Sequence, residues 1–210
     1  MKKYPKEIFI TGTDTDVGKT VISSILAVGL DAHYWKPVQS GLDDCDTDPV
    51  KKNTGFSDES FFPERFRLNA PLSPHISASL DGISIGLDDF NPPEKYERLI
   101  VEGAGGVMVP LNKNDFMADL MKKLGFPVII VARSGLGTIN HTLLTIDYLR
   151  KKGVDIFGVV MNGEKNSENR EAIEHYGKVM VIGEISEIKN INYKTLKEAF
   201  NEFRLQADHN

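Results

Sequence analysis

A glycine-rich segment near the N-terminus, residues 12–20 with the sequence GTDTDVGKT, constrains the fold of this chain more than any other feature. It follows a short apolar run at residues 8–10, and the apolar residues at 21–26 fall on one face of a helix. A strand, a glycine-rich turn and a helix in this order form a phosphate-binding loop, in which N–H groups at the helix start face phosphate oxygens. The segment therefore predicts nucleotide binding.

The last three residues of this loop carry its chemistry. Lys19 is expected to reach the terminal phosphates, and the Thr20 hydroxyl is expected to bind Mg²⁺. The spacing departs from the standard loop, because five residues rather than four separate Gly12 from Gly18, so Thr13 stands where the first glycine belongs. A plain glycine turn before a helix is the alternative, which the strand–loop–helix context disfavours.

Strand-like and helix-like patterns alternate along the chain. Further apolar runs of strand length lie at residues 33–36, 99–101, 128–131, 157–161 and 179–182, and helical patterns at 139–149, 167–176 and 196–203. Continuous apolar runs are typical of parallel strands that are covered on both faces. We therefore expect an α/β fold of the phosphate-loop NTPase type, with a mostly parallel central sheet and helices on both faces.

Length and composition limit the other possibilities. We expect one domain over residues 1–210, with the irregular, Asp- and Pro-rich residues 41–93 forming loops and short helices near the site. The net charge of −5 comes without clustered Lys or Arg, which argues against nucleic-acid binding. No stretch approaches the roughly 18 apolar residues of a membrane span, and the first apolar run is too short for a signal peptide. We expect a cytoplasmic protein that binds no membrane.

A carboxylate follows the buried strand expected at residues 99–101. Glu102 ends a buried strand and precedes Gly103, Ala104 and Gly105, so it is suited to the Mg²⁺ side of a nucleotide site while the glycines let the backbone approach phosphates. An exposed glutamate in a glycine turn is the alternative.

An acidic loop lies near the start of the irregular segment 41–93, with aspartates at Asp43, Asp44, Asp46 and Asp48. Their alternation matches the start of a calcium loop, but Pro49 stands where that loop needs glycine and Gly55 where it needs glutamate. We expect a solvated loop in which Asp48 is the metal or water ligand. Cys45, the single cysteine, excludes an internal disulfide, and its acidic setting disfavours a nucleophilic thiolate.

Lys36 follows the second expected strand and should lie at the carboxyl edge of the sheet. A second lysine beside a transferring phosphoryl group stabilises the charge that develops on it. A surface lysine at a strand end is an equally weighted alternative.

Together these motifs resemble the dethiobiotin synthetases. The resemblance rests on residues 12–20, 36–41, 74–76, 102–106 and 137–141, and it extends to about residue 163. It implies a homodimeric, Mg²⁺-dependent ligase of biotin biosynthesis that makes the cyclic urea of dethiobiotin from diaminopelargonate, carbon dioxide and ATP. It further implies carbamate and carbamic–phosphoric anhydride intermediates, with release of ADP and phosphate.

The resemblance also implies the site residues. Lys36 and Lys19 would be catalytic, and Thr20, Asp48 and Glu102 would hold the metal. The nucleotide would contact Thr13, Asp16, Val17, Gly18, Lys19, Thr20, Val21, Asp48, Glu102, Gly103, Ala104, Gly105, Asn162 and Gly163. The diamine would contact Thr13, Asp16 and Ser40 and, across the dimer interface, the helix start at Gly137, Thr138, Ile139 and Asn140.

Two departures bear on selectivity. Asn162 fits an adenine-reading position, although Asn-Gly is also a common turn pair. Ser186 follows Gly-Glu-Ile where the family has proline, so we expect weaker discrimination for ATP than the family pattern suggests. Acidic residues in the phosphate loop suit a diamine: Asp16 could orient its amino or carbamate end while Asp14 caps the loop's own N–H groups.

Two other functions also use a phosphate loop but fit this chain less well. A glutamine-dependent amidoligase needs an additional domain with a nucleophilic cysteine. A partitioning-type ATPase switch carries an extra lysine near the loop start and often an amphipathic membrane tail. The nearest candidate for such a tail is the stripe of Leu196, Phe200 and Phe203, which is flanked by glutamates and few bases and is expected to pack on the sheet.

Overall fold

The computed structural model describes residues 3–43 and 45–203, so Asp44 of the acidic loop lies outside the described residues. Its main sheet has seven strands in the order β4-β2-β6-β1-β7-β8-β9, and every pairing between neighbouring strands is parallel. The strands are β1 (Glu7–Gly12), β2 (His33–Trp35), β4 (Phe61–Phe62), β6 (Leu99–Gly106), β7 (Val128–Arg133), β8 (Ile156–Asn162) and β9 (Val181–Ile185). The expected α/β fold with a parallel sheet is confirmed.

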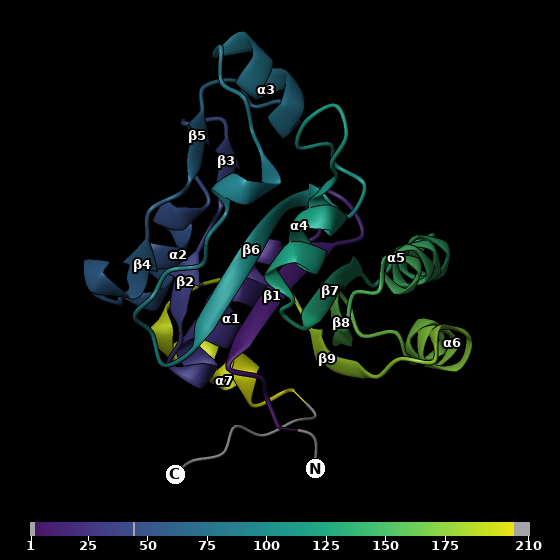
Figure 1. Ribbon diagram of the computed structural model, residues 1–210. Coiled ribbons are helices and arrows are strands. Elements are labelled where there is room, and N and C mark those ends of the chain that lie inside the picture. Colours follow the sequence, from purple (N-terminus) through teal and green to yellow (C-terminus); the bar gives the residue numbers. More distant parts are fainter. Residues whose placement is uncertain (1–2, 44, 204–210) are drawn as a thin grey trace.

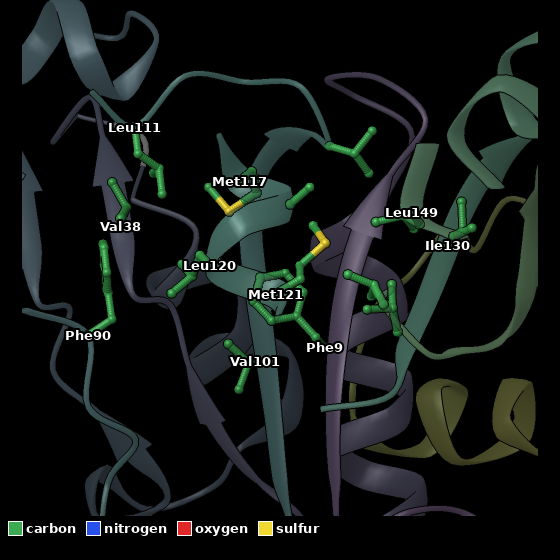
Figure 2. Packing of buried hydrophobic residues seen from close by; sticks show 14 of the residues in the cluster. Phe9, Val38, Phe90, Val101, Leu111, Met117, Leu120, Met121, Ile130 and Leu149 are labelled. Atoms are coloured by element: carbon green, nitrogen blue, oxygen red, sulfur yellow. The ribbon is translucent and has the colours of Figure 1, made fainter. Parts of the chain in front are cut away.

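Helices cover both faces of this sheet (Figure 1). On one face lie α1 (Lys19–Leu30), α2 (Thr47–Thr54) and α7 (Tyr193–Phe200), and on the other α4 (Met117–Leu124), α5 (Thr138–Lys152) and α6 (Ser167–Gly177). Because side chains alternate along a strand, Ile8 and Ile10 of β1 pack with α1, whereas Phe9 packs with α4 and α5. Figure 2 shows the hydrophobic cluster on the face covered by α4, α5 and α6, in which Phe9 lies beside Met121 of α4.

The middle segment forms a small second sheet and short helices beside the main sheet. β3 (Val38–Ser40) pairs in parallel with β5 (Phe66–Leu68), and α3 (Pro74–Leu80), η1 (Asp58–Ser60) and η2 (Leu87–Asp89) are its helical turns. The short strands were not expected from the sequence, because two or three residues are too few for a periodic pattern. Helix α4 was also missed, although Met117, Leu120, Met121 and Leu124 have the spacing of one helical face.

The C-terminal stripe packs as expected. Leu196, Phe200 and Phe203 are 0%, 6% and 5% exposed, and they join the cluster around α1. Gly29 of α1 allows this contact, because a Cβ atom at that position would overlap the Phe200 ring. None of the helices in the described ranges is long and apolar enough to cross a membrane.

Replacing Gly29 by alanine tests the close approach of α1 and α7. Alanine in a helix normally adds about 1 kcal/mol of stability, but overlap with a packed ring costs about 1–3 kcal/mol. We expect the overlap to dominate, so that Gly29→Ala lowers the free energy of unfolding by up to about 2 kcal/mol in urea titrations. Gly135→Ala is the control, since its Cβ would meet no atom within 4 Å. A stabilised Gly29→Ala protein would contradict this packing.

Candidate functional site

The phosphate loop is shaped by two residues with positive φ angles, Asp16 at 55° and Gly18 at 95°. A Cβ atom on Gly18 would also overlap the side-chain amide of Asn162, so this position needs glycine for two reasons. The Thr13 N–H donates to the Val131 carbonyl at 2.9 Å, which ties the loop to β7. The loop thus delivers the chain to the N-terminus of the 12-residue helix α1, where free N–H groups can bind an anion.

Lys19 lies folded back over the loop. Its Nζ donates to the Asp14 carbonyl at 3.1 Å, and burial, followed by the charge of Lys36, lowers the pKa of its ammonium group. Asp14 Oδ1 accepts the Thr15 N–H at 2.7 Å, which is the capping contact expected from the sequence. Arg133, at the end of β7, donates to the Thr15 carbonyl at 3.1 Å and lies 3.5 Å from Asp14 Oδ2.

Glu102 is the centre of the site. The register of β2 on β6 pairs Tyr34 with Ile100 and Trp35 with Val101, so the next step along both chains brings Lys36 beside Glu102. The Glu102 side chain is wholly buried, and its Oε1 accepts hydrogen bonds from the Thr20 hydroxyl at 2.9 Å and from Lys36 Nζ at 3.2 Å.

Tyr34 contacts the other side of this carboxylate. Its hydroxyl donates to Glu102 Oε2 at 3.1 Å. Burial, followed by the negative charges of Glu102 and Asp46, raises the pKa of the Tyr34 phenol well above its ordinary value. Tyr34 therefore remains a hydrogen-bond donor.

Lys36 is a buried cation between two carboxylates. Its Nζ lies 2.6 Å from Asp46 Oδ2, and it also donates to the Gly103 carbonyl at 3.1 Å. Burial opposes the charge most strongly, but Glu102 and Asp46 outweigh burial and raise the pKa of Lys36. The lysine is consequently held as an ammonium ion, and the sequence-based alternative of a surface lysine is wrong.

Asp46, not Asp48, is the aspartate of the acidic loop that reaches the site. Asp46 Oδ1 accepts the Thr20 hydroxyl at 3.2 Å, whereas Asp48 is exposed in the first turn of α2. The structure thus corrects the expectation that Asp48 is the ligand of this loop. The chain turns into α2 directly after Asp46, so Asp46 is left beside Thr20 and the helix carries Asp48 toward solvent.

A cleft of about 790 Å³ opens over this cluster. The sequence-predicted residues that line it are Asp16, Gly18, Lys19, Thr20, Lys36, Ser40, Glu102, Ala104 and Gly105. Its other walls include Val38, Gln39, Val109 and the chain that leads into α3 at residues 71–74. None of these was predicted as a site residue, although residues 36–41 and 74–76 carried the resemblance. The Pro74-His75 motif was the signal for that last wall.

Other predicted residues lie outside the cleft. Thr13, Val17, Val21 and Gly103 shape the loop or the packing around it. Asn162 Nδ2 donates to the Val17 carbonyl at 3.0 Å, and the Gly163 N–H donates to the Ile185 carbonyl at 2.8 Å. The chain at residues 137–140 begins α5, where Gly137 has a φ of 91°, and none of these four residues lines the cleft.

The turn into α2 is fastened by Glu64. Its Oε1 accepts the Thr47 hydroxyl at 2.5 Å and the Cys45 thiol at 3.4 Å, and its Oε2 accepts Arg67 Nη1 at 3.0 Å. Since Cys45 and Thr47 flank Asp46, Glu64 fixes the position of that aspartate. Burial raises the pKa of the Cys45 thiol, in agreement with an unreactive cysteine.

Glu64 predicts a pH-dependent stability. Burial acts to raise the pKa of Glu64, but hydrogen bonds, first from Thr47, then from the backbone N–H of Glu64 itself and then from Arg67, lower it below the ordinary 4.5. The ionised form therefore stabilises the fold above about pH 4.5, and this stabilisation is lost as the pH falls through the lower folded-state pKa. We expect Glu64→Gln to cost about 1–2 kcal/mol of unfolding free energy at pH 7 and progressively less below pH 4.5.

Urea titrations from pH 3 to pH 7 would measure this difference, with Glu59→Gln, on the exposed turn η1, as the control. An equal loss of stability at every pH would contradict the role of the Glu64 carboxylate.

The oxygen atoms of Thr20, Asp46 and Glu102 fit a magnesium ion. Hydroxyl and carboxylate oxygens are the ligands Mg²⁺ prefers, and in nucleotide sites it is bound by one or two carboxylates together with phosphates and water. The described residues contain no group of three or more His, Cys, Asp or Glu that could hold a metal by itself.

Comparisons with known proteins show the family of this chain. A family model described as an AAA domain matches residues 6–195. The chain is 46% identical over 194 residues to "ATP-dependent dethiobiotin synthetase BioD" of Nitrobacter hamburgensis, with 92% of each chain covered. It is 47% identical over 190 residues to the protein of the same name from Paramagnetospirillum magneticum (90% and 92% covered), and 44% over 201 residues to that from Christiangramia forsetii (95% and 97%).

Solved structures show the fold alone. A ParA family ATPase from Chlorobium tepidum superposes with a TM-score of 0.51 at 13% identity, covering 95% of this chain and 91% of the other. The septum site-determining protein MinD from Pyrococcus horikoshii, complexed with Mg-ADP, superposes with a TM-score of 0.53 at 14% identity, covering 94% and 93%. Both support the phosphate-loop architecture.

Proposed function

This chain belongs to the ATP-dependent dethiobiotin synthetases and to the AAA domain family, and from that premise we propose how its cleft performs the reaction. The enzyme is an ATP-dependent ligase of biotin biosynthesis that forms the cyclic urea of dethiobiotin from diaminopelargonate, carbon dioxide and ATP. The observation that carries the assignment of roles is the buried Lys36 ammonium beside the phosphate loop.

The reaction proceeds in three steps. One amino group of the diamine attacks carbon dioxide, loses a proton and becomes a carbamate. A carbamate oxygen attacks the γ-phosphorus of ATP, and ADP leaves from a carbamic–phosphoric anhydride. The second amino group then attacks the carbonyl carbon and loses a proton, so the ring closes and phosphate departs. The protein's task is to hold the three reactants together and to neutralise charge.

The cleft supplies these functions from its own side chains. The start of α1 and Lys19 would bind the phosphates, since both present N–H donors to the cleft. Lys36 would leave its contacts with Asp46 and Glu102 to bridge the carbamate and the phosphoryl group. Thr20, Asp46 and Glu102 would hold Mg²⁺, which when bound neutralises phosphate charge. Asp48 has no place in this arrangement.

The remaining features of the proposal concern assembly and setting. The whole chain, residues 1–210, would act as one phosphate-loop domain. Residues 137–140 line no part of the cleft of their own chain, which supports a homodimer in which this helix start receives the distant carboxylate of a diamine bound by the other subunit. We further propose a cytoplasmic enzyme without nucleic-acid or membrane partners. Asn162 and Gly163, beside the phosphate loop, would face the base.

Asp16 lies on the cleft and is proposed to orient the amino or carbamate end of the diamine. Asp16→Asn should raise the KM for diaminopelargonate or lower kcat by about 10- to 150-fold, since a hydrogen bond to a charged group contributes about 1.5–3 kcal/mol. The KM for ATP should change little. Steady-state kinetics in which neither turnover nor diamine affinity moved would exclude this role.

Lys36 is expected to act on the transition state more than on binding. Removing one preorganised charge from a transition state typically costs about 100- to 1,000-fold in kcat. Lys36→Met should therefore lower kcat by at least about 100-fold while the KM for ATP changes only a few-fold. Lys52→Met, an exposed lysine of α2, is the control. Circular dichroism must show that both variants are folded, and a Lys36→Met enzyme with near-normal kcat would contradict the assignment.

A matched pair of variants decides which aspartate is at the metal. Asp46→Asn should raise the Mg²⁺ concentration for half-maximal activity by about 10-fold or more, whereas Asp48→Asn should leave it unchanged, because only Asp46 contacts Thr20. The reverse result would restore Asp48.

The function itself is tested with Mg²⁺, bicarbonate and ATP, with and without diaminopelargonate. We expect ADP to form only with the diamine and in step with dethiobiotin, which is identified by mass. A rate of ATP hydrolysis that is the same with and without the diamine, with no dethiobiotin formed, would overturn the proposal.

A further inference from the structure

Tyr34 is a buried polar side chain for which the reaction has no direct use. It is the middle residue of β2, is 1% exposed, and its ring lies 6.1 Å from the Phe61 ring. Side chains two residues apart point to the same face of a strand, so Tyr34 and Lys36 both reach Glu102.

The two oxygens of Glu102 have different partners. Oε1 accepts from both Thr20 and Lys36. In the proposed reaction, Thr20 would contact Mg²⁺ and Lys36 would contact the carbamate and the phosphoryl group. Oε2 accepts from Tyr34, whose ring packs among core side chains and which is not itself part of the cleft lining. When Lys36 moves to the carbamate, Tyr34 is the contact that stays.

We propose that Tyr34 is a positioning residue for the metal site, which holds the Glu102 carboxylate so that Oε1 faces Thr20 and the bound ion. The inference rests on the proposed magnesium role of Glu102. A carboxylate turns about its last bond unless a second group holds it, and partners of this kind typically change metal affinity by about 10- to 100-fold when removed. Without the phenol, Oε2 would also be a buried acceptor lacking a partner.

The test compares Tyr34→Phe with Tyr96→Phe. Tyr96 forms the matching contact elsewhere, since its hydroxyl donates to Glu7 Oε1 at 3.2 Å. Phenylalanine keeps each ring, so both proteins should fold, as urea titrations would verify. The readouts are Mn²⁺ binding to the ADP-loaded protein, followed by electron paramagnetic resonance, and the Mg²⁺ concentration that gives half-maximal activity.

We expect Tyr34→Phe to weaken Mn²⁺ binding and Mg²⁺ activation together by about 10- to 100-fold, with kcat at saturating Mg²⁺ within about threefold of wild type. Tyr96→Phe should match wild type. In a Glu102→Gln background, Tyr34→Phe should cause little further loss, because its effect passes through Glu102.

Wild-type metal affinity in Tyr34→Phe would overturn the inference and leave the proposed function intact. An additive loss in the Glu102→Gln background would also overturn it. A wild-type protein that neither binds Mn²⁺ with ADP nor requires Mg²⁺ would instead refute the magnesium role itself.

Discussion

A single buried ammonium ion between two carboxylates organises this molecule. Removing Lys36 and Glu102 from water is costly, whereas Asp46 remains partly exposed. The attraction of Lys36 to both carboxylates offsets that cost only because the geometry is close and the buried charges have further hydrogen-bond partners. Such a cluster contributes little to the stability of the fold, but it holds charged groups at the place where a reaction needs them. When ATP and Mg²⁺ bind, the ammonium can leave the carboxylates to contact the phosphoryl group, and the carboxylates can then contact the metal ion.

The fold builds this cluster from separate elements at one sheet edge. The β2–β6 register sets Lys36 against Glu102, the phosphate loop delivers Thr20 from α1, and the turn before α2 delivers Asp46. Glu64 fastens that turn from behind, as Tyr34 holds Glu102. The groups that touch reactants are therefore each positioned by groups that do not.

Local patterns allowed much of this to be predicted. The phosphate loop, Lys36 and Glu102 follow short apolar runs, and parallel strands bring their carboxyl ends to one edge, so sequence order alone indicates that these residues meet. The choice between Asp46 and Asp48 could not be made in that way, because it depends on Glu64, a residue 18 positions from Asp46 along the chain. The role of Tyr34 was not predicted either, because an aromatic residue within an apolar strand is normally part of the core.

The most direct test of the mechanism follows oxygen atoms. The enzyme would be mixed with Mg²⁺, ATP, diaminopelargonate and ¹⁸O-labelled carbon dioxide, and quenched before the label exchanges with water. If a carbamate oxygen attacks the γ-phosphorus in this cleft, one ¹⁸O passes into each phosphate released and one remains in the urea carbonyl of dethiobiotin. Dethiobiotin formed together with unlabelled phosphate would contradict that attack.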